Sequence, residues 1–244
     1  MDTSLLPSYT WSPDLPDFHD QPYVRTSTEL PAHVDLRPNM PPIFSQGRLG
    51  SCTANALAGQ LGFLHPGSEA FSRLFIYYGE RSLEGSITRD SGAQLRDGIK
   101  FLASSGCCYE SIWPYNTAKF TVKPLAEAYT AAQAHKIISY TRLTSLDDMM
   151  DCLASGFPFV FGFTVYESFE TPAVAKTGIL GMPVPGERPL GGHAVEAVGY
   201  DMASKRLIVR NSWGAGWGQS GHFTMPFDYV INRGLSDDFW TIRK

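Results

Sequence analysis

The amino-acid sequence predicts an α+β protein of two lobes, a class in which helices and strands occupy separate stretches of the chain. Three observations support this prediction. Apolar residues recur at spacings of three and four through the first half, as along helices that bury one face. Short apolar runs separated by glycines fill the second half, as in strands. The patterns change over near residue 135, so we expect a mainly helical lobe at 30–135 and a mainly β lobe at 136–244.

Residues 1–29 precede both lobes and have a different pattern. Four prolines are spaced along them, with the aromatic residues Tyr9, Trp11, Phe18 and Tyr23 in between, and neither a helical nor an alternating period is visible. Proline fixes its own backbone angle and biases the preceding residue to extended conformations. We therefore expect an extended segment that lies along a surface instead of folding as a domain.

The helical half begins with an apolar stripe from Ser51 to Leu64, which Pro66 and Gly67 end. Its spacing predicts a helix of about three turns. Three more stripes of the same kind follow, at Phe71 to Leu83, Ala93 to Ala103 and Pro124 to Ala134.

The second half begins with a strand-like run at 135–140 and, after a predicted helix near 145–155, continues with the apolar run Phe157 to Phe163. Glycines then separate further runs that are rich in β-branched and aromatic residues. These runs predict strands at His193 to Tyr200, Arg206 to Arg210 and His222 to Met225.

The composition excludes several classes of protein. A charged fraction of 18% and a formal net charge of −4 provide no basic face for a phosphate backbone, so we expect no nucleic-acid partner. No stretch approaches the roughly 20 apolar residues that span a bilayer, and the start of the chain lacks the basic and apolar regions of a Sec signal peptide. We expect a soluble monomer, without a membrane partner, that is cytoplasmic or exported by another route.

The four cysteines, at positions 52, 107, 108 and 152, are too few and too irregularly spaced for a disulfide framework. A reducing compartment would suit them. The adjacent pair Cys107 and Cys108 has no matching Cys or His pair to complete a zinc site, so we expect neither a metal nor another cofactor. We interpret these two residues, and Cys152 on an apolar helical face, as structural.

Cys52 differs from the other cysteines because it lies in the first turn of a predicted helix. Unpaired backbone N–H groups and the helix dipole favour an anion there, and a thiolate is a nucleophile. Gly50, just before it, leaves room for the backbone of a substrate. A small buried cysteine at a helix start is also an ordinary packing choice, so position alone leaves both interpretations open.

A thiolate nucleophile needs a base, and His193 is the best candidate among the six histidines. It lies in an apolar strand whose glycine-rich start keeps the ring accessible, although a lone histidine in a strand is more often a core residue. Asn211 follows the next strand, and its amide oxygen can accept the second imidazole N–H. The indole of Trp213 can shield that bond from water. In isolation, the asparagine and the tryptophan would be interpreted as turn and core residues.

Two other enzyme classes are excluded by their motifs. The string Gly216 to Gly221 matches the G-x-G-x-x-G of dinucleotide sites, but a strand-like run follows it where a helix should begin. Trp217, inside the string, would crowd a pyrophosphate. The Gly-x-Ser-x-Gly motif of serine hydrolases is absent from the sequence.

Taken together, three segments resemble the papain-like family of cysteine peptidases. They are the glutamine-to-cysteine segment Gln46 to Cys52, the histidine strand Gly192 to Val195 and the asparagine-tryptophan turn Asn211 to Gly214. His193 follows Cys52 by 141 residues, within the roughly 130 to 150 typical of the family. Leu30 to Arg37 is similar to the start of the family's mature domain, so the resemblance covers about residues 30–230.

The resemblance implies a papain-like fold with a helical left lobe, a β-barrel-like right lobe and the active-site cleft between them. It also implies a cysteine-type endopeptidase that acts on peptide or protein substrates. Cys52 would attack as a thiolate and form a thioester acyl-enzyme, with His193 as acid and base and Asn211 orienting the histidine. Gln46 and the backbone N–H of Cys52 would donate to the oxyanion.

The same resemblance implies that Gly192, Trp213 and Gly92 contact the substrate. The chain departs from the family signature at Leu49 and Thr53, where the family has a cysteine and an aromatic residue. Leu49 cannot form the usual nearby disulfide. The departures indicate a disulfide-poor microbial or viral branch of the family.

Two competing interpretations remain. One is a papain-like binding protein that no longer turns over substrate, and the retention of Gln46, Cys52, His193 and Asn211 argues against it. The other is a peptidyl acyltransferase, which uses the same nucleophile. Residues 1–29 are far shorter than the helical inhibitory prosegment of the family. We expect them either to plug the substrate cleft and inhibit the enzyme or to brace the two lobes.

Overall fold

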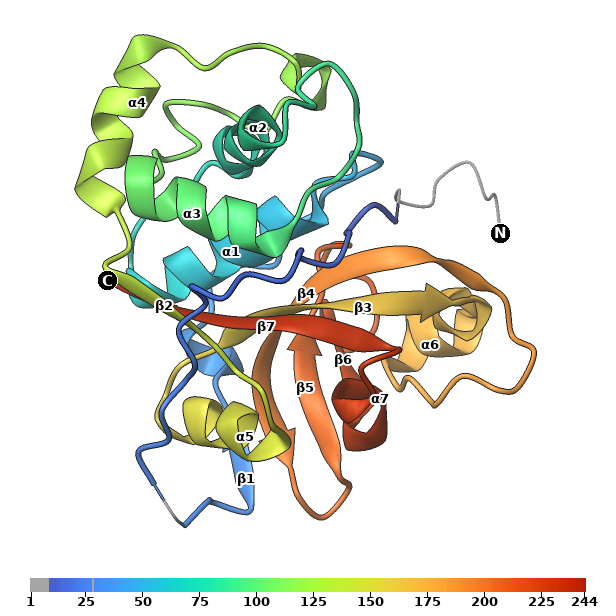
Figure 1. The fold of residues 1–244 in the computed structure, drawn as a ribbon. Helices are drawn as coiled ribbons and strands as arrows, with labels where there is room; N and C mark the ends of the chain where they lie inside the picture. The colour runs from blue at the N-terminus through green and yellow to red at the C-terminus, as the bar shows by residue number, and fades with distance from the viewer. Residues whose placement is uncertain (1–8, 28) are drawn as a thin grey trace.

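Helices and strands occupy different lobes of the folded chain. The structure is a computed structural model that describes residues 9–27 and 29–244. Helices α1 to α4 lie together on one side of it, and an antiparallel sheet lies on the other (Figure 1). The predicted α+β class with two lobes is therefore confirmed.

The helical lobe matches the four predicted stripes, with slightly shifted ends. Its helices are α1 (Cys52–Leu64), α2 (Arg73–Leu83), α3 (Leu95–Ser105) and α4 (Ala126–Ala132). α1 is buried on almost every face, because α2 and α3 pack against it from one side and β3 and β4 from the other. A helix that is apolar all around is typical of a protein interior. α1 is thus the element that joins the two lobes.

The β lobe contains one antiparallel sheet with the strand order β2-β7-β3-β4-β5-β6, and β1 also pairs with β4. The strands are β1 (His33–Asp35), β2 (Ser139–Arg142), β3 (Phe159–Tyr166), β4 (Pro189–Asp201), β5 (Arg206–Arg210), β6 (His222–Pro226) and β7 (Ser236–Arg243). The end strands β2 and β6 do not pair with each other, so the described sheet is not closed into a barrel. The expected β-barrel-like lobe is corrected accordingly. Register shifts within β3 and β4 are the irregularities that bend such a sheet without closing it.

β7 was not apparent in the sequence, although it lies between β2 and β3 in the sheet. It opens with the charged residues Asp237 and Asp238, and Asp238 has a positive φ of 58°. Both carboxylates receive hydrogen bonds from Arg142 on β2. Two carboxylates near the start of a strand interrupt its apolar alternation, so the sequence pattern does not mark it as a strand. The position of β7 beside β2 depends on the Arg142 guanidinium. β2 itself starts at Ser139, later than predicted, because residues 133–135 form a turn of 3-10 helix.

Three short helices accompany the sheet: α5 (Leu146–Ala154), α6 (Pro172–Thr177) and α7 (Phe227–Ile231). α5 agrees with the predicted helix and begins with a capping box formed by Ser145 and Asp148. α6 and α7 were not predicted. No helix among the described residues is long and apolar enough to cross a membrane.

Residues 9–27, called the strap below, extend across both lobes as the dark blue trace between α3 and β7 (Figure 1). The backbone N–H of Trp11 donates to the Gly192 carbonyl on β4 at 3.0 Å. Further along, the N–H of Tyr23 donates to the Arg142 carbonyl on β2 at 2.8 Å. Residues 1–8 of the predicted extended segment lie outside the described residues.

Candidate active site

Cys52 is the first residue of α1, as the sequence predicted, and its side chain is fully buried. Burial raises the pKa of its thiol to about 11, because a thiolate would lose its hydration. The backbone N–H of Ala194 opposes this shift, as do those of Thr53 and Cys52 itself at the start of the helix. Ala194 follows His193 on β4, so the strand brings the predicted base alongside the predicted nucleophile.

His193 is also fully buried, and its ring is bonded to Asn211. Its Nε2 lies 2.9 Å from Asn211 Oδ1, which also accepts the backbone N–H of Ser212 at 2.8 Å. Because only the oxygen of the Asn211 amide can accept a backbone N–H, the atom that faces His193 is an acceptor. His193 Nε2 therefore carries the proton of this hydrogen bond. The neutral tautomer therefore leaves Nδ1 as the nitrogen that can accept a proton. Nδ1 has no hydrogen-bond partner among the described residues.

Three aromatic rings surround the imidazole of His193. Trp213 stacks on it with ring centroids 5.2 Å apart and an interplanar angle of 28°. Phe163 from β3 and Tyr9 from the strap meet it edge-on at 5.8 and 6.1 Å. This apolar enclosure lowers the pKa of His193 to about 4, and the bond to Asn211 opposes the shift. The predicted role of Trp213 as a shield over the histidine agrees with this stacking.

The start of a helix and burial have opposite effects on Cys52. The helix start favours a thiolate, whereas burial raises the pKa of the thiol and also lowers that of the neighbouring imidazole. The enclosed site therefore favours the neutral thiol and neutral imidazole at pH 7. Exposure of the pair to water would remove the largest cause of both shifts.

Gln46 ties the segment before Cys52 to the segment after Asn211. Its Oε1 accepts the Ser212 hydroxyl at 2.6 Å, and its backbone N–H donates to the Ser212 carbonyl at 2.9 Å. Its Nε2 donates to the Leu49 carbonyl at 3.0 Å. These bonds bring the predicted oxyanion donor into the same site as Cys52, with one of its two amide hydrogens engaged by Leu49.

Two residues that support this loop were missed by the sequence analysis. The Tyr115 hydroxyl lies 2.6 Å from Ser51 Oγ and donates to the Gln46 carbonyl at 3.0 Å. The guanidinium of Arg73 lies over the Tyr115 ring, with its carbon 3.8 Å from the ring centroid, and donates to the Ser45 carbonyl. No local pattern marks either residue, because each approaches the loop from a distant part of the chain.

The glycines predicted to contact substrate instead contact the strap. A side chain at Gly92, whose φ is 70°, would place its Cβ 2.0 Å from the Thr10 carbonyl oxygen. A Cβ at Gly192 would lie 2.2 Å from the Trp11 carbonyl oxygen. Both glycines therefore allow a backbone to pass closely. In this structure, that backbone belongs to the chain itself.

The strap lies against His193 and against the loop that precedes Cys52. Tyr9 donates to Glu170 at 2.5 Å while its ring meets His193, and Thr10 donates to the Gly50 carbonyl at 2.9 Å. Trp11 is 7% exposed, and its indole occupies the space that a side chain at Gly162 would need. The strap thus contributes to the burial of His193.

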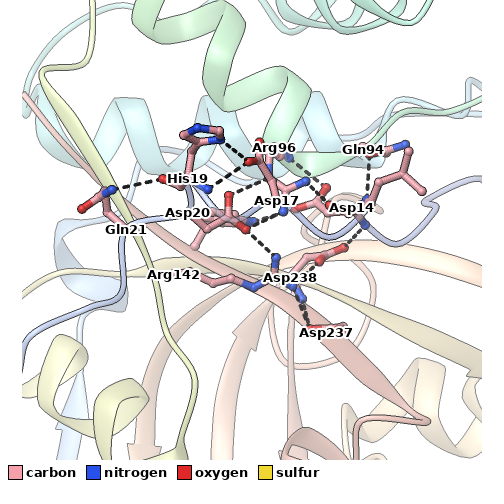
Figure 2. A network of polar contacts seen from close by, with 12 residues as sticks. Asp14, Asp17, His19, Asp20, Gln21, Gln94, Arg96, Arg142, Asp237 and Asp238 are labelled. Carbon is pink, nitrogen blue, oxygen red and sulfur yellow. Dashed lines mark hydrogen bonds and ion pairs between the residues drawn. The ribbon is translucent and has the colours of Figure 1, made fainter.

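Beyond Trp11, carboxylates fasten the strap to both lobes (Figure 2). Asp14 accepts the backbone N–H of Arg96 on α3 at 3.1 Å and the indole N–H of Trp240 on β7 at 2.8 Å. Asp20 accepts hydrogen bonds from both Arg96 and Arg142, at 2.5 and 3.1 Å. α3 belongs to the helical lobe and β2 and β7 to the sheet, so these two residues bridge the lobes.

The other cysteines are separate from this group. Cys107, Cys108 and Cys152 are buried and unbridged, and burial raises the pKa of each thiol. The described residues include no group of three or more histidine, cysteine or acidic side chains able to hold a metal ion. A cavity of about 730 Å³ between Pro38–Phe44 and the end of α1 contains none of the predicted site residues.

Comparisons with known proteins agree with this geometry. The family model for papain family cysteine proteases matches residues 30–237. A peptidase C1-like protein of Acanthamoeba polyphaga mimivirus is 49% identical over 213 residues, which are 82% of this chain and 68% of the viral protein. Cysteine proteinase 3 of Entamoeba histolytica is 27% identical over 219 residues, covering 85% of this chain and 67% of that protein.

Solved structures share the fold. The crystal structure of xylellain, a cysteine protease from Xylella fastidiosa, superimposes with a TM-score of 0.90 at 40% identity, covering 98% of this chain and 96% of that one. Digestive procathepsin L 3 of Tenebrio molitor has the same fold, with a TM-score of 0.72 at 19% identity over 92% of this chain and 74% of that one. The papain-like fold is thereby confirmed. A viral and a bacterial relative also agree with the predicted microbial or viral branch.

Proposed function

Given that this chain belongs to the papain family of cysteine proteases, we propose that Cys52, His193 and Asn211 hydrolyse internal peptide bonds and that the strap lowers the turnover of the full chain. The observation that carries the catalytic assignment is the hydrogen bond of 2.9 Å between His193 and Asn211. The next residue on the same strand, Ala194, directs its backbone N–H to the Cys52 thiol. This arrangement leaves His193 Nδ1 able to take the thiol proton.

In the proposed reaction, proton transfer from Cys52 to His193 Nδ1 produces the thiolate, which attacks the scissile carbonyl carbon. The resulting oxyanion accepts hydrogen bonds from the backbone N–H of Cys52 and from the second amide hydrogen of Gln46. When the C–N bond breaks, the leaving amine takes the proton from His193 and a thioester remains on Cys52. Water then attacks the thioester as His193 takes its proton. The C–S bond breaks, the acid product leaves, and the Cys52 sulfur recovers the proton from His193.

The strap blocks this reaction because it occupies the position that substrate would need. Its backbone crosses the two glycines that the sequence assigned to substrate binding, and its Tyr9 ring meets the imidazole of His193 edge-on. A tethered ligand competes at an effective concentration in the millimolar range, so even weak contacts suppress turnover. The contacts of the strap to both lobes also support a role in bracing the lobes. One segment can both block the substrate cleft and brace the lobes.

The two competing activities make different predictions. A papain-like binding protein would need no intact chain of bonds from Gln46 through Ser212 and Asn211 to His193, and that chain favours an enzyme. An acyltransferase would share every residue with a hydrolase. The amount of amide product formed when an amine is added measures the balance between the two.

Labelling with a thiol-directed peptidyl epoxide, together with a fluorogenic peptide assay, tests the proposal. Wild type, Cys52→Ala and Cys152→Ser should be compared both as the full chain and as a chain starting at Leu30, so that a closed strap is not mistaken for a dead site. We expect Cys52→Ala to lose labelling and turnover by at least about four orders of magnitude, and Cys152→Ser to keep both. Turnover in Cys52→Ala, or its loss in a folded Cys152→Ser variant, would overturn the assignment.

A further inference from the structure

A buried carboxylate behind Asn211 has no role in the reaction described so far. Glu196 lies on β4, is 1% exposed, and both of its carboxyl oxygens lack a hydrogen-bond partner among the described residues. A buried polar atom without a partner is costly, so an unpaired carboxyl group requires an explanation.

The surroundings of Glu196 are built around its carboxyl group. Arg210, its cross-strand partner on β5, approaches to 3.7 Å but directs its terminal nitrogens to the carbonyls of Pro41 and Pro42. On α1, Gly59 leaves the space that the carboxyl fills, since a Cβ there would lie 2.4 Å from Glu196 Oε2. Burial raises the pKa of Glu196 to about 8, with Arg210 opposing the shift. The raised pKa favours the protonated carboxyl group, which can both donate and accept hydrogen bonds.

The same place also contains the unpaired end of the catalytic asparagine. Asn211 uses its oxygen for His193 and Ser212, while its Nδ2, which is buried, has no partner among the described residues. Glu196, Arg210 and Asn211 line one small cavity of about 10 Å³. A single water needs about 10–15 Å³ and two to four polar partners. The cavity thus has the size and the lining of a site for one water.

We propose that Glu196 is a positioning residue that holds the Asn211 amide through one buried water. The water accepts a hydrogen bond from Asn211 Nδ2 and bonds to a carboxyl oxygen of Glu196. With both ends of the amide engaged, its plane stays fixed, and Oδ1 keeps the His193 ring in the tautomer that leaves Nδ1 free. The amide is also polarised, which strengthens its bond to the imidazolium that forms during the reaction. This inference rests on the proposed function of Asn211.

A double-mutant cycle with Asn211→Ala tests whether Glu196 acts through the asparagine. In the full chain, Glu196→Leu should lower kcat by about tenfold and leave KM within about twofold, since Glu196 does not reach the substrate side of the site. In an Asn211→Ala background, the same change should alter kcat less than twofold. Glu196→Gln, which keeps the size and the hydrogen bonds, should retain at least half of the activity. A tenfold loss in both backgrounds, or an unchanged kcat in Glu196→Leu, would overturn the proposal.

Val209→Ala provides the matched control for lost stability. Val209 is fully buried next to Arg210 on β5 but does not line the cavity. Its truncation should lower the melting temperature and leave kcat unchanged within twofold. If it lowers kcat as much as Glu196→Leu does, the effect of Glu196 is structural and the proposal fails. Should Glu196→Leu not fold, Glu196→Ala, which leaves room for water, takes its place.

Two readouts do not depend on turnover. In the proton NMR spectrum, the His193 Nε2–H resonance should persist in wild type and Glu196→Gln and broaden in Glu196→Leu, because the amide that holds it becomes mobile. A high-resolution crystal structure should contain a water bonded to Asn211 Nδ2 and Glu196. A dry cavity or an unchanged resonance in Glu196→Leu would contradict the inference. If the wild type lacks turnover yet both signatures are present, the proposed function fails and the positioning contact stands.

Discussion

The two parts of the strap are held in different ways. Its cleft part, Tyr9 to Trp11, is held mainly by shape: it passes over glycines, buries an indole and packs a ring against His193. Its anchor part, Asp14 to Ser27, is held mainly by charge, with carboxylates that accept hydrogen bonds from arginines and from backbone N–H groups of both lobes. Blocking and fastening are thus assigned to different residues.

The anchor part also uses a carboxylate supplied by the β lobe. Asp151 on α5 accepts the backbone N–H groups of Thr26 and Ser27 at 2.9 Å each, and the Tyr23 hydroxyl at 2.8 Å. By contrast, Phe18 in the same part of the strap is fully exposed. The difference teaches that the aromatic residues of the strap are not equivalent: Trp11 beside β4 is buried and Tyr9 is half-buried against His193, whereas Phe18 can be changed as a control.

The largest effect should come from opening the cleft part. Because burial raises the pKa of the Cys52 thiol to about 11, the neutral thiol predominates at pH 7. Trp11→Ala removes the buried indole and admits water, so we expect the rate of Cys52 alkylation by iodoacetamide at pH 7 to rise at least about 100-fold. Mass spectrometry of the labelled peptide measures it. Phe18→Ala should leave the rate unchanged, and a wild-type rate as fast as that of Trp11→Ala would refute the plug.

Removing both parts together should have the next largest effect. A chain that starts at Leu30 loses a tethered competitor, so we expect turnover of a fluorogenic peptide to rise at least about tenfold. The bonds of Asp14 and Asp20 are lost with it, so the melting temperature should fall by several degrees. Lower activity together with a lower melting temperature would mean that bracing, and not blocking, is the main role of these residues.

Weakening only the anchor part should change stability more than activity. Asp20 is 14% exposed and bonds to two arginines that are 5% and 18% exposed, so Asp20→Asn should cost about 2–3 kcal/mol of unfolding free energy. For a chain of this size, that lowers the melting temperature by roughly 4–10 °C. Turnover should rise no more than about threefold, since the cleft contacts remain.

The exposed pair Glu167–Arg188, with side chains 50% and 70% exposed, is the control for Asp20→Asn. Glu167→Gln should change the unfolding free energy by less than about 0.5 kcal/mol. An equal loss of stability in both variants would show that the anchor network is no stronger than a surface ion pair.

The smallest expected effect is a pH dependence of the anchor part. Burial raises the pKa of Asp238 to about 7, the charge of Asp14 adds to the shift, and Arg142 opposes it. A carboxyl whose folded pKa is raised contributes stability below its unfolded pKa of about 4 and loses that contribution as the pH rises through 7. The Asp14 N–H donates to Asp238 at 2.7 Å, so its hydrogen exchange, corrected for the intrinsic rate, should speed up between pH 5 and pH 8.

Asp238→Asn should flatten this dependence. Asparagine tolerates the positive φ of 58° at this position, so the variant tests the charge and not the backbone. Asp20, Asp237 and Arg96 also face the pair. Corrected exchange of the Asp14 amide that is independent of pH in the wild type would contradict the assignment.

Much of the fold and the site could be predicted from local patterns. The stripe that became α1 placed Cys52 at a helix start, and the run around His193 became the long strand β4. Proline spacing indicated an extended strap, whose described part is extended. These features depend on residues close together in sequence, so neighbours alone determine them.

Other features could not be predicted because their causes lie far apart in the chain. β7 takes a central place with two carboxylates at its start because Arg142, almost a hundred residues earlier, receives both. Tyr115 supports the Gln46 loop from a segment without any motif. The barrel-like sheet was wrong because closure depends on strand register, which hydrophobic alternation does not specify.

The sequence by itself identified the residues that we propose supply the chemistry of this protein, since a helix start, a strand histidine and a turn asparagine are properties of short segments. Only the tertiary structure decided the state of that chemistry. Burial raises the pKa of Cys52 and lowers that of His193, and Glu196 and Asn211 line the same small cavity. The physical reason is that desolvation depends on everything packed around a group, and the packing atoms here come from the strap, α1 and the sheet together.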